Sequence, residues 1–143
     1  MKVGEIMSSP LETINAEATI TNAAEKMKSF DIGVLPVMNE DEVVGIITDR
    51  DIVVRVIAEG LDPQSTQVKR AMTTEIFSCP EDMDIEDAAK LMEDRQVHRL
   101  LVLGEEGAVT GILSIGDIAR KTEQDQDHLV HELVEKICVP ARF

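Results

Sequence analysis

The chain is short and acidic, with 143 residues and a formal net charge of −14. Its hydrophobic fraction of 43% is enough for a packed core and argues against a fully disordered chain. The acidic charge and the scarcity of aromatic side chains (three Phe, no Trp, no Tyr) argue against a nucleic-acid partner, which needs cations and stacking rings. No apolar run is long enough to cross a bilayer and the N-terminus lacks the apolar core of a signal peptide, so we expect a cytoplasmic protein without a membrane partner.

The first predicted helix follows Thr19, a residue type favoured at N-caps. Its apolar positions recur at helical spacing, and they are Ile20, Ala23, Ala24 and Met27. Two short apolar runs, Val34–Met38 and Val43–Thr48, then flank a polar turn and predict a hairpin. Pro36 favours an edge or strand-start position within the first run. A second helix is predicted from Asp51 to about Glu59, ended by Gly60.

The same pattern occurs again further along the chain. A shift of 65 residues places Met7 on Met72 and Ile20 on Ile85, and after one extra loop residue a shift of 66 places Asp51 on Asp117. The second copy therefore predicts a helix behind Asp84, a hairpin and a second helix. Their ranges are 85–92, Leu100–Leu103, Ala108–Ser114 and Asp117 to about Lys121.

Each copy is too small for an independent core of ordinary stability. We therefore expect an α+β (α/β-like) fold in which two tandem β-α-β-β-α units pack as a pseudo-twofold pair. The predicted boundaries are 1–60 for the first unit, 61–67 for a linker and 68–123 for the second unit. The remaining residues, 124–143, carry an apolar stripe at helical spacing and predict a C-terminal helix that packs back on the pair or contributes to a dimer.

One motif occurs in both copies at a strand-to-helix junction: glycine, two apolar residues, Thr or Ser, two further residues and Asp. It spans Gly45–Asp51 and Gly111–Asp117. Backbone N–H groups at a helix start and the hydroxyls of Thr48 and Ser114 suit a phosphate, while the carboxylates of Asp51 and Asp117 suit the two hydroxyls of a ribose. Helix capping by the same residues is the alternative interpretation. The occurrence of two equivalent copies favours binding.

These residues resemble the CBS-domain pair, or Bateman module. The resemblance rests on Glu5-Ile6-Met7, the two Ala-Ala helices, Gly33–Val37 and Gly45–Asp51. The stretches Thr48–Arg55, Gly60–Pro63 and Lys136–Pro140 are similar to small stand-alone CBS proteins of the hypoxic-response type.

The resemblance implies that clefts between the two units bind an adenosine-containing ligand such as AMP, ADP, ATP or S-adenosylmethionine. It assigns the phosphate to Thr48 and Ser114 and the ribose to Asp51 and Asp117. His98 and Arg99 are similar to a phosphate-binding segment of the adenylate-sensing subunit of AMP-activated protein kinase, and a solvated strand entry is their alternative interpretation.

The two motifs differ in their cations. By the same resemblance Arg50 faces phosphate in the first copy, whereas the second copy carries Ile115 and Gly116 where the first has Asp49 and Arg50. We therefore expect unequal clefts, and a ligand that binds only once is expected beside Asp51.

The sequence thus predicts a non-enzymatic regulatory module that requires no cofactor, takes an adenine nucleotide as its regulatory ligand and forms a homodimer. It does not identify the regulated protein. The alternative is a ligand-free structural or interaction protein that acts through its dimer surface.

His128 and His131, which have Glu132, Glu135 and Cys138 nearby in sequence, could face one metal ion, but an exposed polar helix face is the favoured interpretation. Cys79 and Cys138 are expected to be free buried thiols, with a redox switch as the alternative.

Overall fold

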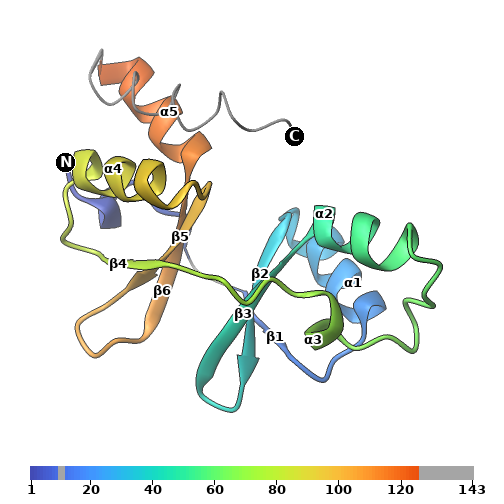
Figure 1. Cartoon of the computed structure of the whole chain (residues 1–143). Coiled ribbons are helices and arrows are strands. Elements are labelled where there is room, and N and C mark those ends of the chain that lie inside the picture. Colours follow the sequence, from blue (N-terminus) through green and yellow to red (C-terminus); the bar gives the residue numbers. More distant parts are fainter. Residues whose placement is uncertain (10–11, 126–143) are drawn as a thin grey trace. The chain divides into compact units, whose positions relative to one another are not determined.

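The computed structural model describes residues 1–9 and 12–125, and its fold is of the predicted α+β class. The chain forms two compact units, each built on a three-stranded sheet (Figure 1). The first-repeat unit is Glu12–Ile76, and the second-repeat unit combines the described parts of Met1–Leu11 and Phe77–Phe143. The predicted boundaries follow the sequence repeats instead and remain a prediction.

The first-repeat unit follows the β-α-β-β-α order. Its elements are β1 (Ile14–Asn15), α1 (Ile20–Phe30), β2 (Val34–Asn39), β3 (Glu42–Thr48), α2 (Asp49–Ile52), the π-helix η2 (Val53–Ile57) and α3 (Val68–Ala71). The hydroxyl of Thr19 accepts a hydrogen bond from Asn22 N at 3.1 Å, as the predicted N-cap requires. The helix predicted from Asp51 to about Glu59 consists of the short α-helix α2, which continues as the π-helix η2. The π-helix is a rare form that often marks functional sites.

Strand order in this sheet is β1-β2-β3, with β1 parallel to β2 and β2 antiparallel to β3. The interpretation of Pro36 as an edge or strand-start residue is wrong, because β2 is the central strand and Pro36 is its third residue. The proline is accommodated because β1 pairs only with Val37 and Met38, so Pro36 has a strand partner on the β3 side alone.

The second-repeat unit has the same order. Its elements are the 3₁₀-helix η1 (Val3–Glu5), β4 (Ser78–Pro80), α4 (Ile85–Arg95), β5 (Arg99–Leu103), β6 (Val109–Ser114) and α5 (Ile115–Asp125). Figure 1 shows α4 and α5 lying together against the β5–β6 hairpin. Asp84 occupies the predicted N-cap position, but its carboxylate makes no capping bond and instead lies 2.9 Å from Lys2 Nζ.

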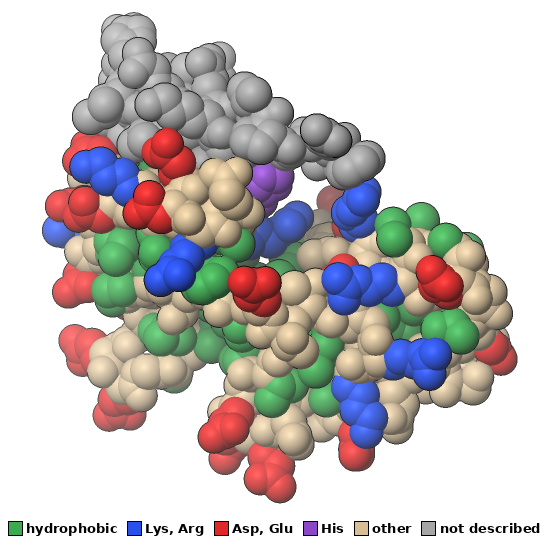
Figure 2. Space-filling view, in the orientation of Figure 1, with side chains coloured by type: hydrophobic (Ala, Val, Ile, Leu, Met, Phe, Trp, Pro, Cys, Tyr) green, Lys and Arg blue, Asp and Glu red, His purple; other side chains and the backbone are tan. Residues whose placement is uncertain are grey.

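Each unit has a core of aliphatic side chains, as the near absence of aromatic residues predicts. Residues that are 0% exposed include Ile20, Leu35 and Ile47 in the first-repeat unit, and Met92 and Leu113 in the second. Among the charged residues of the described chain, only Asp51 and Asp117 are buried, and Figure 2 shows acidic and basic groups interspersed over the visible face of both units.

The two repeats exchange their opening segments, which we define as residues 3–8 and 68–73. Val3, at 0% exposed, packs in the core of the second-repeat unit, and Ser8 exchanges backbone hydrogen bonds with Ile112 at 2.9 and 3.2 Å. Reciprocally, Val68 is buried in the first-repeat unit, and Thr73 exchanges backbone bonds with Ile46 at 2.8 and 2.9 Å. Each sheet is thus completed by a segment that belongs to the other repeat in sequence.

Candidate functional site

The glycine that begins each motif makes this exchange possible. A Cβ atom at Gly45 would lie 2.7 Å from the carbonyl oxygen of Thr73, and one at Gly111 would lie 2.8 Å from that of Ser8. Real Cβ atoms essentially never approach another atom so closely. The motif glycine therefore allows the opening segment to lie directly against the strand that leads to the candidate site.

In the first-repeat unit, Thr48 and Asp51 form a reciprocal capping box at the start of α2. Thr48 N donates to Asp51 Oδ2 at 3.0 Å, and Asp51 N donates to Thr48 Oγ1 at 3.1 Å. Both residues are buried, at 8% exposed. Helix capping, the alternative interpretation from sequence, is confirmed here, and it uses only one of the two carboxylate oxygens.

The second oxygen, Asp51 Oδ1, has looser neighbours. Thr73 Oγ1 donates to it at 3.4 Å, and Arg55 Nε lies 3.7 Å away. Arg55 is held elsewhere, because its Nη1 donates to the carbonyl oxygen of Met72 at 3.1 Å. Neither Thr73 nor Arg55 was predicted from the sequence, although the i,i+4 spacing of Asp51 and Arg55 was a usable signal for Arg55.

The second-repeat unit repeats the capping geometry with Ser114 and Asp117. Ser114 N donates to Asp117 Oδ2 at 2.9 Å, and Asp117 N donates to Ser114 Oγ at 3.1 Å. Here Asp117 Oδ1 accepts a short hydrogen bond of 2.6 Å from Arg120 Nη2. Arg120 was also missed, although an acid and a base three residues apart on a helix are a recognisable pair.

His98 and Arg99 lie beside this second motif. Arg99 is the register partner of Ser114 across β5 and β6, and the carbonyl oxygen of His98 accepts a hydrogen bond from Ile115 N at 2.9 Å. His98 is half-buried and Arg99 is exposed.

The seven predicted site residues thus fall into two groups, which we call half-sites. The first-repeat half-site is Thr48, Arg50 and Asp51; the second-repeat half-site is His98, Arg99, Ser114 and Asp117. Arg50 is exposed in the first turn of α2, where its backbone N–H donates to Asp49 Oδ1 at 2.9 Å. The predicted ligand clefts between the two repeats remain a prediction.

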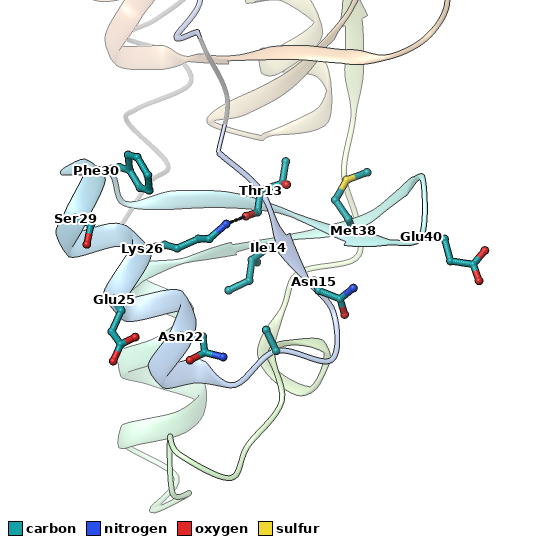
Figure 3. A pocket seen from close by; sticks show the side chains of 11 residues that line it. Thr13, Ile14, Asn15, Asn22, Glu25, Lys26, Ser29, Phe30, Met38 and Glu40 are labelled. Atoms are coloured by element: carbon teal, nitrogen blue, oxygen red, sulfur yellow. Dashed lines mark hydrogen bonds between the residues drawn. The ribbon is translucent and has the colours of Figure 1, made fainter.

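A separate hollow of about 740 Å³ lies beside α1 and β1 in the first-repeat unit (Figure 3). Asn22, Lys26 and Phe30 line it from α1, and Lys26 Nζ donates to the carbonyl oxygen of Thr13 at 2.6 Å across it. None of the seven predicted site residues lines this hollow.

The remaining sequence-based expectations concern thiols, metals and membranes. Burial raises the pKa of the Cys79 thiol to about 11, so it is protonated at neutral pH and a poor nucleophile. Residues 1–9 and 12–125 contain no cluster of three His, Cys, Asp or Glu side chains arranged for a metal ion. The other residues of those hypotheses, His128, His131 and Cys138, lie outside the described residues. No helix within the described part of the chain has the length and apolar character of a membrane span.

Two stretches of the chain, residues 3–58 and 68–123, match the family model of the CBS domain. The chain belongs to the CBS domain family. Both matches contain one copy of the motif described above, so this protein is a CBS pair, as its resemblance to the Bateman module implied. The similarity to CBS pairs covers both the sequence and the fold.

Among curated proteins, the CBS pair is 38% identical over 117 residues to the CBS domain-containing protein YhcV of Bacillus subtilis, covering 82% of each chain. It is 34% identical over 137 residues to Hypoxic response protein 1 of Mycobacterium tuberculosis, covering 95% of this chain and 93% of that one. Among solved structures, the CBS domain pair of protein MJ0100 in complex with 5′-methylthioadenosine and S-adenosylmethionine superimposes with a TM-score of 0.76. That match is 25% identical and covers 87% of this chain and 98% of the other.

Proposed function

We propose that this CBS pair is a non-enzymatic regulatory module that binds an adenosine-containing ligand, namely AMP, ADP, ATP or S-adenosylmethionine. One observation carries the proposal: in both half-sites the capping box uses Oδ2 of the aspartate and leaves Oδ1 for another donor. A carboxylate oxygen held in this way is a ready acceptor for ribose hydroxyls, because the capping bonds already fix the side chain.

The other half-site residues fit the remaining parts of a nucleotide. The exposed guanidinium groups of Arg50 and Arg99 are cations for a phosphate, and the His98 imidazole is a further donor. The hydroxyls of Thr48 and Ser114 lie at the start of their helices, where positive helix-dipole ends favour an anion. The MJ0100 pair, which shares the fold and 25% of its residues, binds two adenosine-containing compounds, and this supports adenosine as the common element of the ligand.

We test the ligand by isothermal titration calorimetry of the ligand-free protein with AMP, ATP and S-adenosylmethionine. The variant Asp51→Asn keeps one oxygen for capping but replaces the charged oxygen that accepts from the ribose hydroxyls with an amide NH2 group. We expect it to lower affinity at the first-repeat half-site about ten- to hundredfold, since hydrogen bonds to charged groups are worth about 1.5–3 kcal/mol.

Asp49→Asn is the matched control, because Asp49 lies in the same motif but is exposed and accepts from the adjacent Arg50 N–H. It should retain wild-type affinity to within about twofold. Equal losses in both variants would contradict the ribose assignment, and the absence of any binding heat with all three compounds would reject the proposed function.

We also infer that the CBS pair is a homodimer through an apolar face of η2. Val53, Val54 and Ile57 are 58%, 43% and 55% exposed, and they lie at helical spacing on one surface. Their counterparts in the second repeat, 66 residues later, are Ala119, Arg120 and Glu123, so the apolar face belongs to the first repeat alone. A second copy of this face is the occupant of matching chemistry that buries it without an unpaired charge.

Light scattering after size exclusion tests the dimer. We expect a dimer for the wild type and a monomer for Ile57→Glu, which places a charge in the buried patch. Ser29→Glu, which adds the same charge on the exposed side of α1, should remain dimeric. A monomeric wild type, or a dimeric Ile57→Glu variant, would contradict this interface.

A further inference from the structure

An arginine outside the shared motif, Arg120, contacts the second-repeat half-site, and the first repeat has no arginine at the equivalent position. Arg120 lies on α5, its guanidinium is bonded to Asp117 Oδ1 at 2.6 Å, and its side chain is 72% exposed. Asp117 is by contrast only 9% exposed. A solvent-exposed cation is thus bonded to the carboxylate oxygen that the proposed function gives to the ribose.

The guanidinium of Arg120 lies next to Gly116. A Cβ atom at Gly116 would lie in ordinary van der Waals contact, 3.4 Å from Arg120 Nη1 and 3.7 Å from Ser114 Oγ. Gly116 is the second-repeat counterpart of Arg50, and Arg120 is the counterpart of Val54. Two arginines, Arg50 and Arg55, lie within two turns of Asp51, whereas in the second repeat Arg120 lies within one turn of Asp117 and its guanidinium occupies the space beside residue 116.

We propose that Arg120 is a phosphate-binding cation of the second-repeat half-site in addition to Arg99, held on Asp117 Oδ1 until the ribose of a nucleotide takes that oxygen. The proposal rests on the proposed function. It also adds a cation to a half-site whose motif carries Gly116 at the position of Arg50.

The exchange of partners conserves hydrogen bonds. A ribose hydroxyl donates to Asp117 Oδ1 in place of the Arg120 N–H, and the released guanidinium donates to the phosphate oxygens instead. No proton is transferred, and no covalent bond forms or breaks. A neutral nucleoside displaces the arginine without offering it a new partner, so Arg120 makes the half-site select phosphorylated ligands over unphosphorylated ones.

The first-repeat half-site lacks this arrangement. Arg55, the arginine next to Asp51, lies 3.7 Å from Oδ1 and is bonded through Nη1 to the carbonyl oxygen of Met72. Its guanidinium is therefore bonded to the backbone of the opening segment 68–73 and does not move from the aspartate to a phosphate as proposed for Arg120. The two half-sites are expected to differ in their selectivity for phosphate.

The test follows backbone amides of ¹⁵N-labelled protein during titration with AMP and with adenosine. Ser114 and Asp117 report on the second-repeat half-site, and Thr48 and Asp51 report on the first. In the variant Arg120→Gln we expect AMP to bind the second half-site about tenfold more weakly, while adenosine binds equally well or more tightly. The first half-site should be unchanged.

Arg95→Gln is the matched control, because Arg95 is an exposed arginine of the same unit that stacks over Phe77 at 5.1 Å. It should leave the ratio of AMP to adenosine affinity as in the wild type, and the amide spectrum of each variant verifies its fold. An unchanged ratio in Arg120→Gln overturns the proposal. So does a wild-type protein in which only Thr48 and Asp51 respond, an outcome that leaves the proposed function intact. If neither pair responds to AMP, ATP or S-adenosylmethionine, the proposed function and this inference are both rejected.

Discussion

Replacing Val3 by alanine tests whether the opening segment of the first repeat belongs to the core of the second-repeat unit. Val3 is 0% exposed and packs among Ile85, Met92 and Leu113 in one buried cluster. The substitution removes two methyl groups, worth about 0.8 kcal/mol each, and leaves a cavity, so we expect a loss of about 2–3 kcal/mol in the free energy of unfolding. With a urea m-value of about 1–2 kcal/mol/M, the midpoint should fall by about 1–3 M.

Urea unfolding followed by circular dichroism measures this shift. Thr74→Ala is the matched control, since it also shortens a β-branched side chain to alanine, but at an exposed position outside the proposed dimer face. It should move the midpoint by less than about 0.5 M. Val68→Ala, in the reciprocal opening segment, should behave like Val3→Ala because Val68 is also 0% exposed. Equal midpoints for Val3→Ala and Thr74→Ala would refute the exchange of segments.

Three further predictions concern the second-repeat unit and the packing of the opening segment 68–73 against β3. Cys79 should react with iodoacetamide far more slowly than an unfolded thiol at pH 8, because burial raises its pKa to about 11; a rate equal to that of the denatured chain would contradict its burial. Lys2→Gln should raise the pKa of Asp84, measured by NMR titration, because Lys2 lowers it by a side-chain hydrogen bond and by charge. A lowered carboxyl pKa stabilises the folded protein above the unfolded value of about 3.8, and this stabilisation is lost as the pH falls through the folded value. The free energy of unfolding of Lys2→Gln should therefore differ from that of the wild type near neutral pH and not in strong acid. Gly45→Ala should lower the unfolding midpoint, because its Cβ would lie 2.7 Å from the carbonyl oxygen of Thr73, and a midpoint equal to the wild type would show that the opening segment does not lie against β3.

The elements with a strong periodic signal were predictable from the sequence. The four apolar positions that define α1 span more than two turns, and both hairpins follow from apolar runs separated by polar turns. β1 and β4 have only two and three residues, which is too short for an alternating pattern, so an initial strand was expected in each repeat but could not be placed.

The exchange of opening segments could not be predicted in this way. Periodicity shows which face of a segment is apolar, but not which sheet that face covers. Met7 and Met72 were correctly matched as equivalent residues, yet each belongs to the unit built on the other repeat's sheet. The tight approach at Gly45 and Gly111 is the structural reason for the glycine in the motif, and it becomes evident only when the pairing partner is known.

The candidate site was predictable to the level of the motif. The pairs Thr48 with Asp51 and Ser114 with Asp117 do form local capping boxes, because both partners lie within one helical turn. The neighbours that distinguish the two half-sites were not recognised, since Thr73 is distant in sequence and Arg120 lies one turn beyond the motif. The asymmetry expected from Arg50 and Gly116 is therefore only part of the difference between them.

The most direct test of ribose binding by the two aspartates is a crystal structure of this CBS pair with AMP, at a concentration that calorimetry shows to be saturating. We predict a ribose hydroxyl within about 2.5–3.2 Å of Asp51 Oδ1 or Asp117 Oδ1. Density for the nucleotide in the hollow beside β1, against Lys26 and Phe30, with neither aspartate in contact, would contradict it.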